Sequence, residues 1–174
     1  MKFYLDYNYF FITSRTLDQG KYFAEDYQKQ IVLTKILEIA KDFNINFEAY
    51  CILSNHYHMF FYLTKGGDLK DLMKKINGGI SYELNKNVKE KRNIWDGYHI
   101  SNVFGEESFY RVLGYIIGNP FKHGLVKSID DLGNYKFCNY NEKVKIYGKE
   151  GINEIICNVK NLNWELNLGK NIKL

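Results

Sequence analysis

The apolar residues of the chain change their spacing several times, and each spacing indicates a different element. Residues 8–14, 46–53 and 56–63 are rich in aromatic and β-branched side chains, which is typical of strands. The last two stretches are separated only by Ser54 and Asn55, the spacing of a tight hairpin. Residues 56–63 are apolar at both alternating sets of positions, which predicts a central strand that is covered on both faces.

Helical spacing follows in three places. Between residues 22 and 43, apolar side chains recur every three or four positions, as on the buried side of an amphipathic helix. Residues 106–118 repeat this pattern and carry two acids in the first turn, where the helix dipole favours them. A shorter helix is expected from residue 68 to about residue 75, interrupted at Gly78-Gly79, with resumption to Asn87 as an open alternative. Residues 88–105 show no regular pattern. The order strand, helix, hairpin, helix predicts an α+β fold with an antiparallel sheet.

Composition and length restrict the class of protein. The chain has 174 residues, of which 45% are hydrophobic and 25% charged, and this fits a single globular domain. Its apolar runs are shorter than the roughly 20 residues that span a bilayer, and residues 1–8 do not resemble a secretory signal, so we expect a cytoplasmic protein without membrane contact. Three widely spaced cysteines exclude a Cys-x-x-Cys zinc ribbon and disfavour a disulfide framework.

The net charge of +4 is concentrated in one stretch. Residues 65–92 contain eight Lys or Arg and four Asp or Glu, so the remainder of the chain is balanced. Such a cluster could follow a nucleic-acid backbone, although lysines on a helix are also its ordinary solvated face. Trp95 comes just after this stretch and could either stack on unpaired bases or belong to the core.

The string His56-Tyr57-His58 lies on the predicted central strand. Since side chains alternate along a strand, both imidazoles point to one face, about 6.6 Å apart along the backbone. This arrangement suits two ligands of one metal ion. Ordinary half-buried histidines are an equally simple interpretation of the string taken alone.

Tyr115 and Asn119 are four residues apart on the predicted helix and therefore share a face. This face is polar and also carries Arg111. Pro120 disfavours helical geometry at Asn119, so the helix should end there and leave the amide free to meet a ligand. A helix cap at Asn119 and a chance position for the tyrosine remain as alternatives.

These residues occur in strings that resemble a known family. Residues 111–126, R-V-L-G-Y-I-I-G-N-P-F-K-H-G-L-V, resemble the Y-I-x-x-N-P-x-x-A-G-L-V signature of REP-associated tyrosine transposases, and residues 54–60, S-N-H-Y-H-M-F, resemble their P-N-H-x-H segment. Further matches occur at residues 11–15, 93–99 and 134–140, in the family's order. The chain departs from the family pattern at Phe11, Ser54 and His123, none of which removes a catalytic group.

The resemblance implies a single-tyrosine HUH nuclease on a ferredoxin-like or RRM-like antiparallel sheet backed by helices. It places this domain in residues 1–140, followed by an extension in residues 141–174 that packs on the domain or forms a tail. It also implies a divalent metal, Mg²⁺ or Mn²⁺, held by His56, His58 and Asn119. Tyr115 would be the nucleophile, forming a 5′-phosphotyrosine with DNA.

The implied partner is single-stranded or hairpin DNA, cut near hairpin-forming repeats, and we expect a monomer in preference to a homodimer. The residues expected to contact DNA are Arg15, Lys70, Lys74, Lys75, Arg92, Trp95, Arg111 and Lys122. Two other interpretations stay open. One is a non-catalytic RRM-like module that binds single-stranded nucleic acid through its aromatic side chains. The other is a metal-dependent hydrolase that uses water in place of tyrosine.

Overall fold

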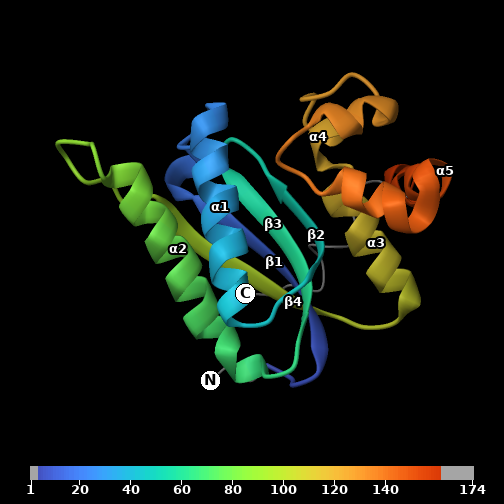
Figure 1. Ribbon diagram of the computed structural model, residues 1–174, viewed down its shortest axis with the longest axis horizontal. Helices are drawn as coiled ribbons and strands as arrows, with labels where there is room; N and C mark the ends of the chain where they lie inside the picture. Colours follow the sequence, from blue (N-terminus) through green and yellow to red (C-terminus); the bar gives the residue numbers. More distant parts are fainter. Residues whose placement is uncertain (1–3, 162–174) are drawn as a thin grey trace.

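The computed structural model of the protein describes residues 4–161 (Figure 1). Within these residues, four strands and five α-helices follow one another along the chain. The strands are β1 (Asn8–Thr16), β2 (Phe47–Ile52), β3 (His56–Leu63) and β4 (Trp95–Val103); the α-helices are α1 (Asp26–Asp42), α2 (Leu69–Asn85), α3 (Glu106–Ile117), α4 (Asn119–Lys122) and α5 (Tyr140–Asn161).

The strands form one antiparallel sheet in the order β2-β3-β1-β4. β3 lies between β2 and β1, as the doubly apolar pattern of residues 56–63 predicts. The backbone N–H of Leu53 donates to the carbonyl of His56 at 2.8 Å and closes the hairpin between β2 and β3. The predicted α+β class, with an antiparallel sheet backed by helices, is confirmed.

Helices cover both faces of this sheet. Because side chains alternate along a strand, Tyr57 and Phe61 of β3 join the core under α1 and α2, whereas Phe60 joins the core under α3 and α5. Figure 1 shows the two helical layers on either side of the sheet. The even-numbered positions of β3 therefore face α3, and His56 and His58 are among them.

The strand β4 is absent from the sequence-based prediction, which leaves residues 88–105 without regular structure. Among the described strands, β4 is at the edge and pairs with β1 alone, and most of its side chains are exposed or half-buried. Its sequence W-D-G-Y-H-I-S-N-V therefore lacks the apolar run of an inner strand. Pairing with β1, rather than local pattern, determines this element.

The expected interruption of the second helix at Gly78-Gly79 is wrong, because α2 continues to Asn85. A Cβ atom at Gly79 would lie 3.5 to 3.6 Å from side-chain atoms of Ile39 and Lys35 in α1. The two helices thus approach closely at this point. Packing against α1 offsets the cost of about 1 kcal/mol that each glycine adds to a helix.

The polypeptide breaks its helical course around Asn119, as the sequence predicts. α3 ends at Ile117, and a separate short helix, α4, starts at Asn119 with Pro120 in its first turn. Proline is tolerated there because the first N–H groups of a helix have no intrahelical acceptor. The break brings Asn119 to the start of α4, where it is fully buried.

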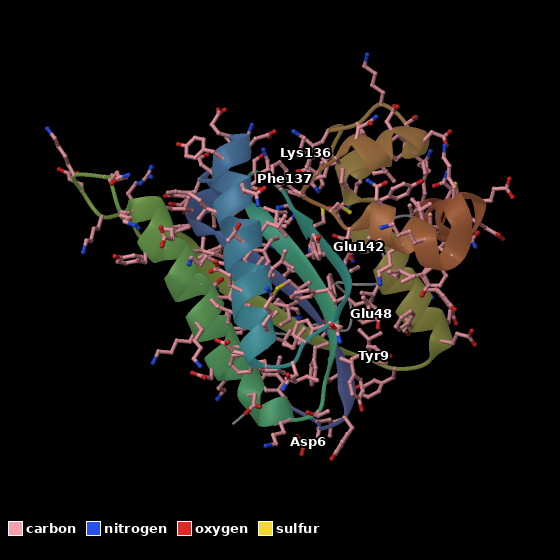
Figure 2. All side chains as sticks on the ribbon, viewed as in Figure 1. Asp6, Tyr9, Glu48, Lys136, Phe137 and Glu142 are labelled. Atoms are coloured by element: carbon pink, nitrogen blue, oxygen red, sulfur yellow. The ribbon has the colours of Figure 1, made fainter. Side chains whose placement is uncertain are left out.

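The last described helix, α5, packs along α3. A Cβ atom at Gly114 of α3 would lie 2.7 Å from the carbonyl oxygen of Ile155, so the two helices touch there. The amine of Lys143 also donates to the carbonyl of Phe47 at 3.4 Å and lies 3.5 Å from Glu48, and Figure 2 shows Glu48 on the side of β2 that faces α5. Residues 162–174, the rest of the expected extension, lie outside the described residues. No helix in residues 4–161 has the length and apolar character needed to cross a membrane.

Candidate active site

The two histidines of β3 lie side by side at the start of the strand. Their ring centroids are 4.9 Å apart, with the rings nearly perpendicular. His58 is buried and its ring lies 5.6 Å from that of Phe11, the neighbouring residue of β1 on the same face. Both imidazoles therefore point into the layer between the sheet and α3.

A hydrogen bond orients each imidazole through its Nδ1 atom. His58 Nδ1 shares a hydrogen bond of 2.9 Å with the hydroxyl of Thr13, the residue that faces it across β1. His56 Nδ1 donates to the side-chain oxygen of Asn55 at 2.8 Å. Metal-binding histidines commonly engage one ring nitrogen in this way and use the other as the ligand. Nε2 of His58 is buried and has no hydrogen-bond partner.

Tyr115 of α3 lies on the same side of the sheet as these histidines. Its ring centroid is 5.4 Å from that of His58 and 6.0 Å from that of Phe11. The hydrophobic residues on the buried side of α3 hold the helix against the sheet and aim Tyr115 at β3. The structure thus brings together the two groups that the sequence places 57 positions apart.

Asn119 adds a third polar group. Its side-chain N–H donates to the carbonyl oxygen of Tyr115 at 2.9 Å, and its side-chain oxygen is buried without a hydrogen-bond partner. An unpartnered buried oxygen and the unpartnered Nε2 of His58 each lack the interaction that buried polar atoms normally have. Two imidazole nitrogens and an amide oxygen form a donor set that fits Mn²⁺ or Mg²⁺. Residues 4–161 contain no group of three or more His, Cys, Asp or Glu side chains placed to hold a metal.

The imidazoles are uncharged at neutral pH. Burial, reinforced by the nearby charges of His123, Arg15 and Lys122, lowers the pKa of His56 to about 4. Burial also holds the pKa of His58 well below its usual value, and the neighbouring His56 lowers it further. The neutral form is the one that binds metal ions.

A family of known proteins matches most of the chain. Residues 6–119 match the family described as "Transposase IS200 like". The chain belongs to this transposase family. Among solved structures, the transposase is similar to a REP-associated tyrosine transposase bound to a REP hairpin, with a TM-score of 0.69 and 20% identity over 83% of this chain and 84% of that chain. The resemblance indicated by residues 54–60 and 111–126 is confirmed, and at this identity the structural match shows a common fold.

A second similar structure, from Deinococcus radiodurans R1, is a transposase candidate with a TM-score of 0.46 and 15% identity, covering 67% of this chain and 93% of that chain. No curated protein matches the transposase sequence.

Lys122, the last residue of α4, and His123, which follows it, also lie at the site of the transposase. The amine of Lys122 lies 4.9 Å from the ring centroid of Tyr115. The ring of His123 lies 5.4 Å from that of His56. In the sequence, His123 stands out only as a departure from the family pattern. Its position four residues after Asn119 places it on the same side of a helical turn as Asn119. Arg15 pairs with His56 across β1 and β3 and is exposed beside the imidazoles.

The lysines expected to contact DNA on α2 lie in the other layer. α2 covers the face of the sheet opposite to the imidazoles. Lys75 forms an ion pair of 3.1 Å with Asp71, and its amine lies over the ring of Phe43 at 5.0 Å. Lys70 and Lys74 are exposed on the same helix. The structure does not bring these residues to the site.

Three further expected DNA contacts also lie away from the imidazoles. The guanidinium of Arg92 lies 5.4 Å from the ring centroid of Tyr22. Trp95 is half-buried against Tyr57 under α2, and its indole N–H donates to the carbonyl of Asn77 at 2.9 Å, as a core residue would. Arg111 pairs with Glu107 and lines a cavity between α3 and α5.

Proposed function

We propose that this transposase cuts and rejoins single-stranded DNA through a covalent bond between Tyr115 and a 5′-phosphate. The observation that carries the proposal is the position of the Tyr115 ring, 5.4 Å from His58 on the same side of the sheet. Beside it lie two buried polar atoms without partners, Nε2 of His58 and the side-chain oxygen of Asn119. A cation bound beside Tyr115 would supply the partner that both atoms lack.

His56, His58 and Asn119 would hold a divalent cation, Mg²⁺ or Mn²⁺. When bound, such an ion draws negative charge from a non-bridging oxygen of a phosphodiester. Thr13 and Asn55 engage the Nδ1 atoms of the two imidazole rings and so fix the orientation of each ring before a cation binds. Orientation of this kind lowers the cost of assembling the reactive geometry.

Tyr115 supplies the nucleophile. Its phenolic oxygen forms a bond to phosphorus while the bond from phosphorus to the 3′-oxygen breaks, and the 3′-oxygen leaves as a hydroxyl after taking up a proton. The phenol must lose its own proton as it attacks, since its ordinary pKa is about 10. The ammonium of Lys122, which lies 4.9 Å from the ring centroid, favours the developing negative charge. The free 3′-hydroxyl of a second strand can reverse the reaction, so rejoining requires no ATP.

We propose hairpin-forming repetitive DNA as the substrate, bound by a monomer. The similar structure, which shares the fold over 83% of this chain, carries a REP hairpin. Arg15 and Lys122 place positive charge beside the imidazoles, where the phosphodiester would lie. The α2 lysines would then contact a more distant part of the hairpin.

Denaturing electrophoresis of the products tests the proposal. The protein is incubated with 5′-labelled and 3′-labelled hairpin DNA, with Mn²⁺ or with a chelator, and a denaturation-resistant adduct carrying the 3′ label is expected only with the metal. Tyr115→Phe should remove cutting and adduct but keep DNA binding. The matched control Tyr27→Phe, at an exposed tyrosine of α1, should retain both.

The competing functions give other patterns. A nuclease that uses water would produce cut DNA without an adduct, and its Tyr115→Phe variant would still cut DNA. A binding module of RRM type would retain the DNA and leave it intact. Either pattern contradicts the assignment of Tyr115.

A further inference from the structure

A cavity of about 480 Å³ lies between α3 and α5, outside the layer that holds the imidazoles. The helices touch at Gly114, where only a glycine fits against the carbonyl of Ile155. The cavity is lined by residues of the first half of α3 and by α5 residues that include Gly151, which contributes no side chain. Its volume lies within the range of roughly 300 to 1,000 Å³ typical of small-ligand sites.

Aromatic and aliphatic side chains make up most of its wall. The rings of Tyr110 and Tyr147 meet edge to face at 6.2 Å, and Ile155 and Val159 complete the apolar part. An aromatic ligand could stack on these surfaces, a contact worth roughly five-fold or more in affinity per DNA base. The wall therefore favours a flat, uncharged ring system.

The polar part of the wall carries the guanidinium of Arg111, two carboxylates and the side-chain amide of Asn158. Arg111 pairs with Glu107, but its Nε atom is buried and has no hydrogen-bond partner. The carboxylates of Glu107 and Glu154 lie on the same wall. Two carboxylates repel a phosphate. A guanidinium and carboxylates on one wall instead suit a ligand that accepts hydrogen bonds on one edge and donates them on another.

We propose that this cavity binds an unpaired guanine base of the DNA strand on which the transposase acts. Guanine accepts hydrogen bonds from arginine through N7 and O6, and its 2-amino group donates to a carboxylate. Adenine would present a donor, its 6-amino group, where guanine presents O6. Arg111, expected from the sequence to contact phosphate, is thereby assigned to a base.

The cavity is close enough to Tyr115 to serve the same strand. Arg111 and Tyr115 are separated by four residues of α3, a rise of about 6 Å. A base held at Arg111 would thus belong to a nucleotide near the phosphate that Tyr115 attacks, and would help to select the position of the cut. This inference rests on the proposed function, since it takes DNA as the ligand.

Equilibrium binding in the presence of a chelator tests the inference without cleavage. Fluorescence anisotropy is measured with labelled hairpins whose single-stranded flank consists of thymine with one guanine, moved from position to position. At one position we expect the wild type to bind guanine at least about five-fold more tightly than adenine or 7-deazaguanine, which lacks the N7 acceptor. Arg111→Gln should abolish this preference and leave the affinity for the adenine hairpin within about two-fold.

Matched variants separate the cavity from its surroundings. Glu107→Gln should weaken the guanine preference, whereas Glu106→Gln, on the neighbouring residue that does not line the cavity, should not change it. Tyr115→Phe should keep the preference. A preference that is absent at every position, or that survives Arg111→Gln, overturns the guanine site and leaves the proposed function intact. A protein that binds none of the hairpins contradicts the proposed function itself.

Discussion

At the scale of single residues, the histidine rings are held by partners from other parts of the chain before any ligand is present. Thr13 comes from β1 and Asn55 from the turn before β3. Each engages one imidazole Nδ1 and leaves Nε2 for a ligand. These two residues are therefore expected to act on the site without touching DNA.

Thr13→Val tests this role because valine keeps the volume and removes the hydroxyl. Loss of the bond to His58 Nδ1 should weaken Mn²⁺ binding by about 10- to 100-fold, since partners of this kind hold the ligand ring in place. Isothermal titration calorimetry measures the affinity. Thr64→Val, an exposed residue just after β3, is the control and should change nothing. Equal Mn²⁺ affinity in Thr13→Val and wild type would show that the hydroxyl does not orient the imidazole.

Acid should destabilise the metal-free protein through the buried imidazoles. The pKa of His56 is lowered to about 4 in the folded state, whereas an unfolded histidine titrates near 6.5. The contribution of neutral His56 to the unfolding free energy is therefore fully present above pH 6.5. It is lost as the pH falls toward 4, because the unfolded histidine takes up a proton first. Between pH 7.5 and pH 5, His56 alone should lower the unfolding free energy by about 2 kcal/mol.

Urea denaturation at the two pH values, with a chelator present, measures this effect. His56→Gln should reduce the loss, and His58→Gln should reduce it further, because burial lowers the pKa of His58 as well. An unfolding free energy that does not depend on pH in this interval would contradict the depressed pKa values.

Local pattern predicts the site only within each element. Alternation along β3 places His56 and His58 on one face, and helical spacing places Tyr115 near Asn119. These pairs are adjacent in the structure as expected. Thr13 reaches the site only through the register of β1 with β3, which no local spacing specifies.

At the scale of the elements, Gly114 of α3 and Gly78 of α2 have opposite roles. Gly114 is required because a Cβ atom there would collide with the backbone of α5 at 2.7 Å. Gly78 of α2 has no neighbouring atom within 4 Å of such a Cβ.

The same spacing rules that predict inner strands and amphipathic helices miss β4, whose existence depends on its partner β1.

Alanine at these two positions should therefore have opposite effects. Gly114→Ala should lower the unfolding free energy by about 1 to 3 kcal/mol through overpacking against the carbonyl of Ile155. Gly78→Ala should raise it by up to about 1 kcal/mol, because alanine is the better helix former. Chemical denaturation of both variants gives the comparison. A Gly114→Ala protein as stable as the wild type would mean that α5 can move away from α3.

At the scale of the whole molecule, positive charge lies on both sides of the sheet. Arg15 and Lys122 stand beside the imidazoles, whereas Lys70, Lys74 and Lys75 belong to α2 on the opposite side. A short single strand can reach only the first group if it is bound for reaction at Tyr115. A hairpin can extend to the second.

Variants of the two groups of basic residues should therefore affect the binding of different DNA substrates. Combined Arg15→Ala and Lys122→Ala should weaken binding of a short single strand and reduce the slope of its salt dependence by about 1.4, which is about 0.7 for each lost phosphate contact. The triple alanine variant of Lys70, Lys74 and Lys75 should affect only the longer hairpin. Anisotropy titrations at several salt concentrations distinguish the cases. Equal losses for both DNAs in the triple variant would place the single strand on the α2 side.

The central claim is that the phenolic oxygen of Tyr115 becomes bonded to a DNA phosphate. Mass spectrometry of the proteolysed adduct, formed with Mn²⁺ on hairpin DNA, identifies the modified residue directly. We predict a peptide in which Tyr115 carries the 5′-phosphate of the cleaved strand. A nucleotide linked to any other side chain, or cleavage of the DNA without a linked peptide, would contradict the account.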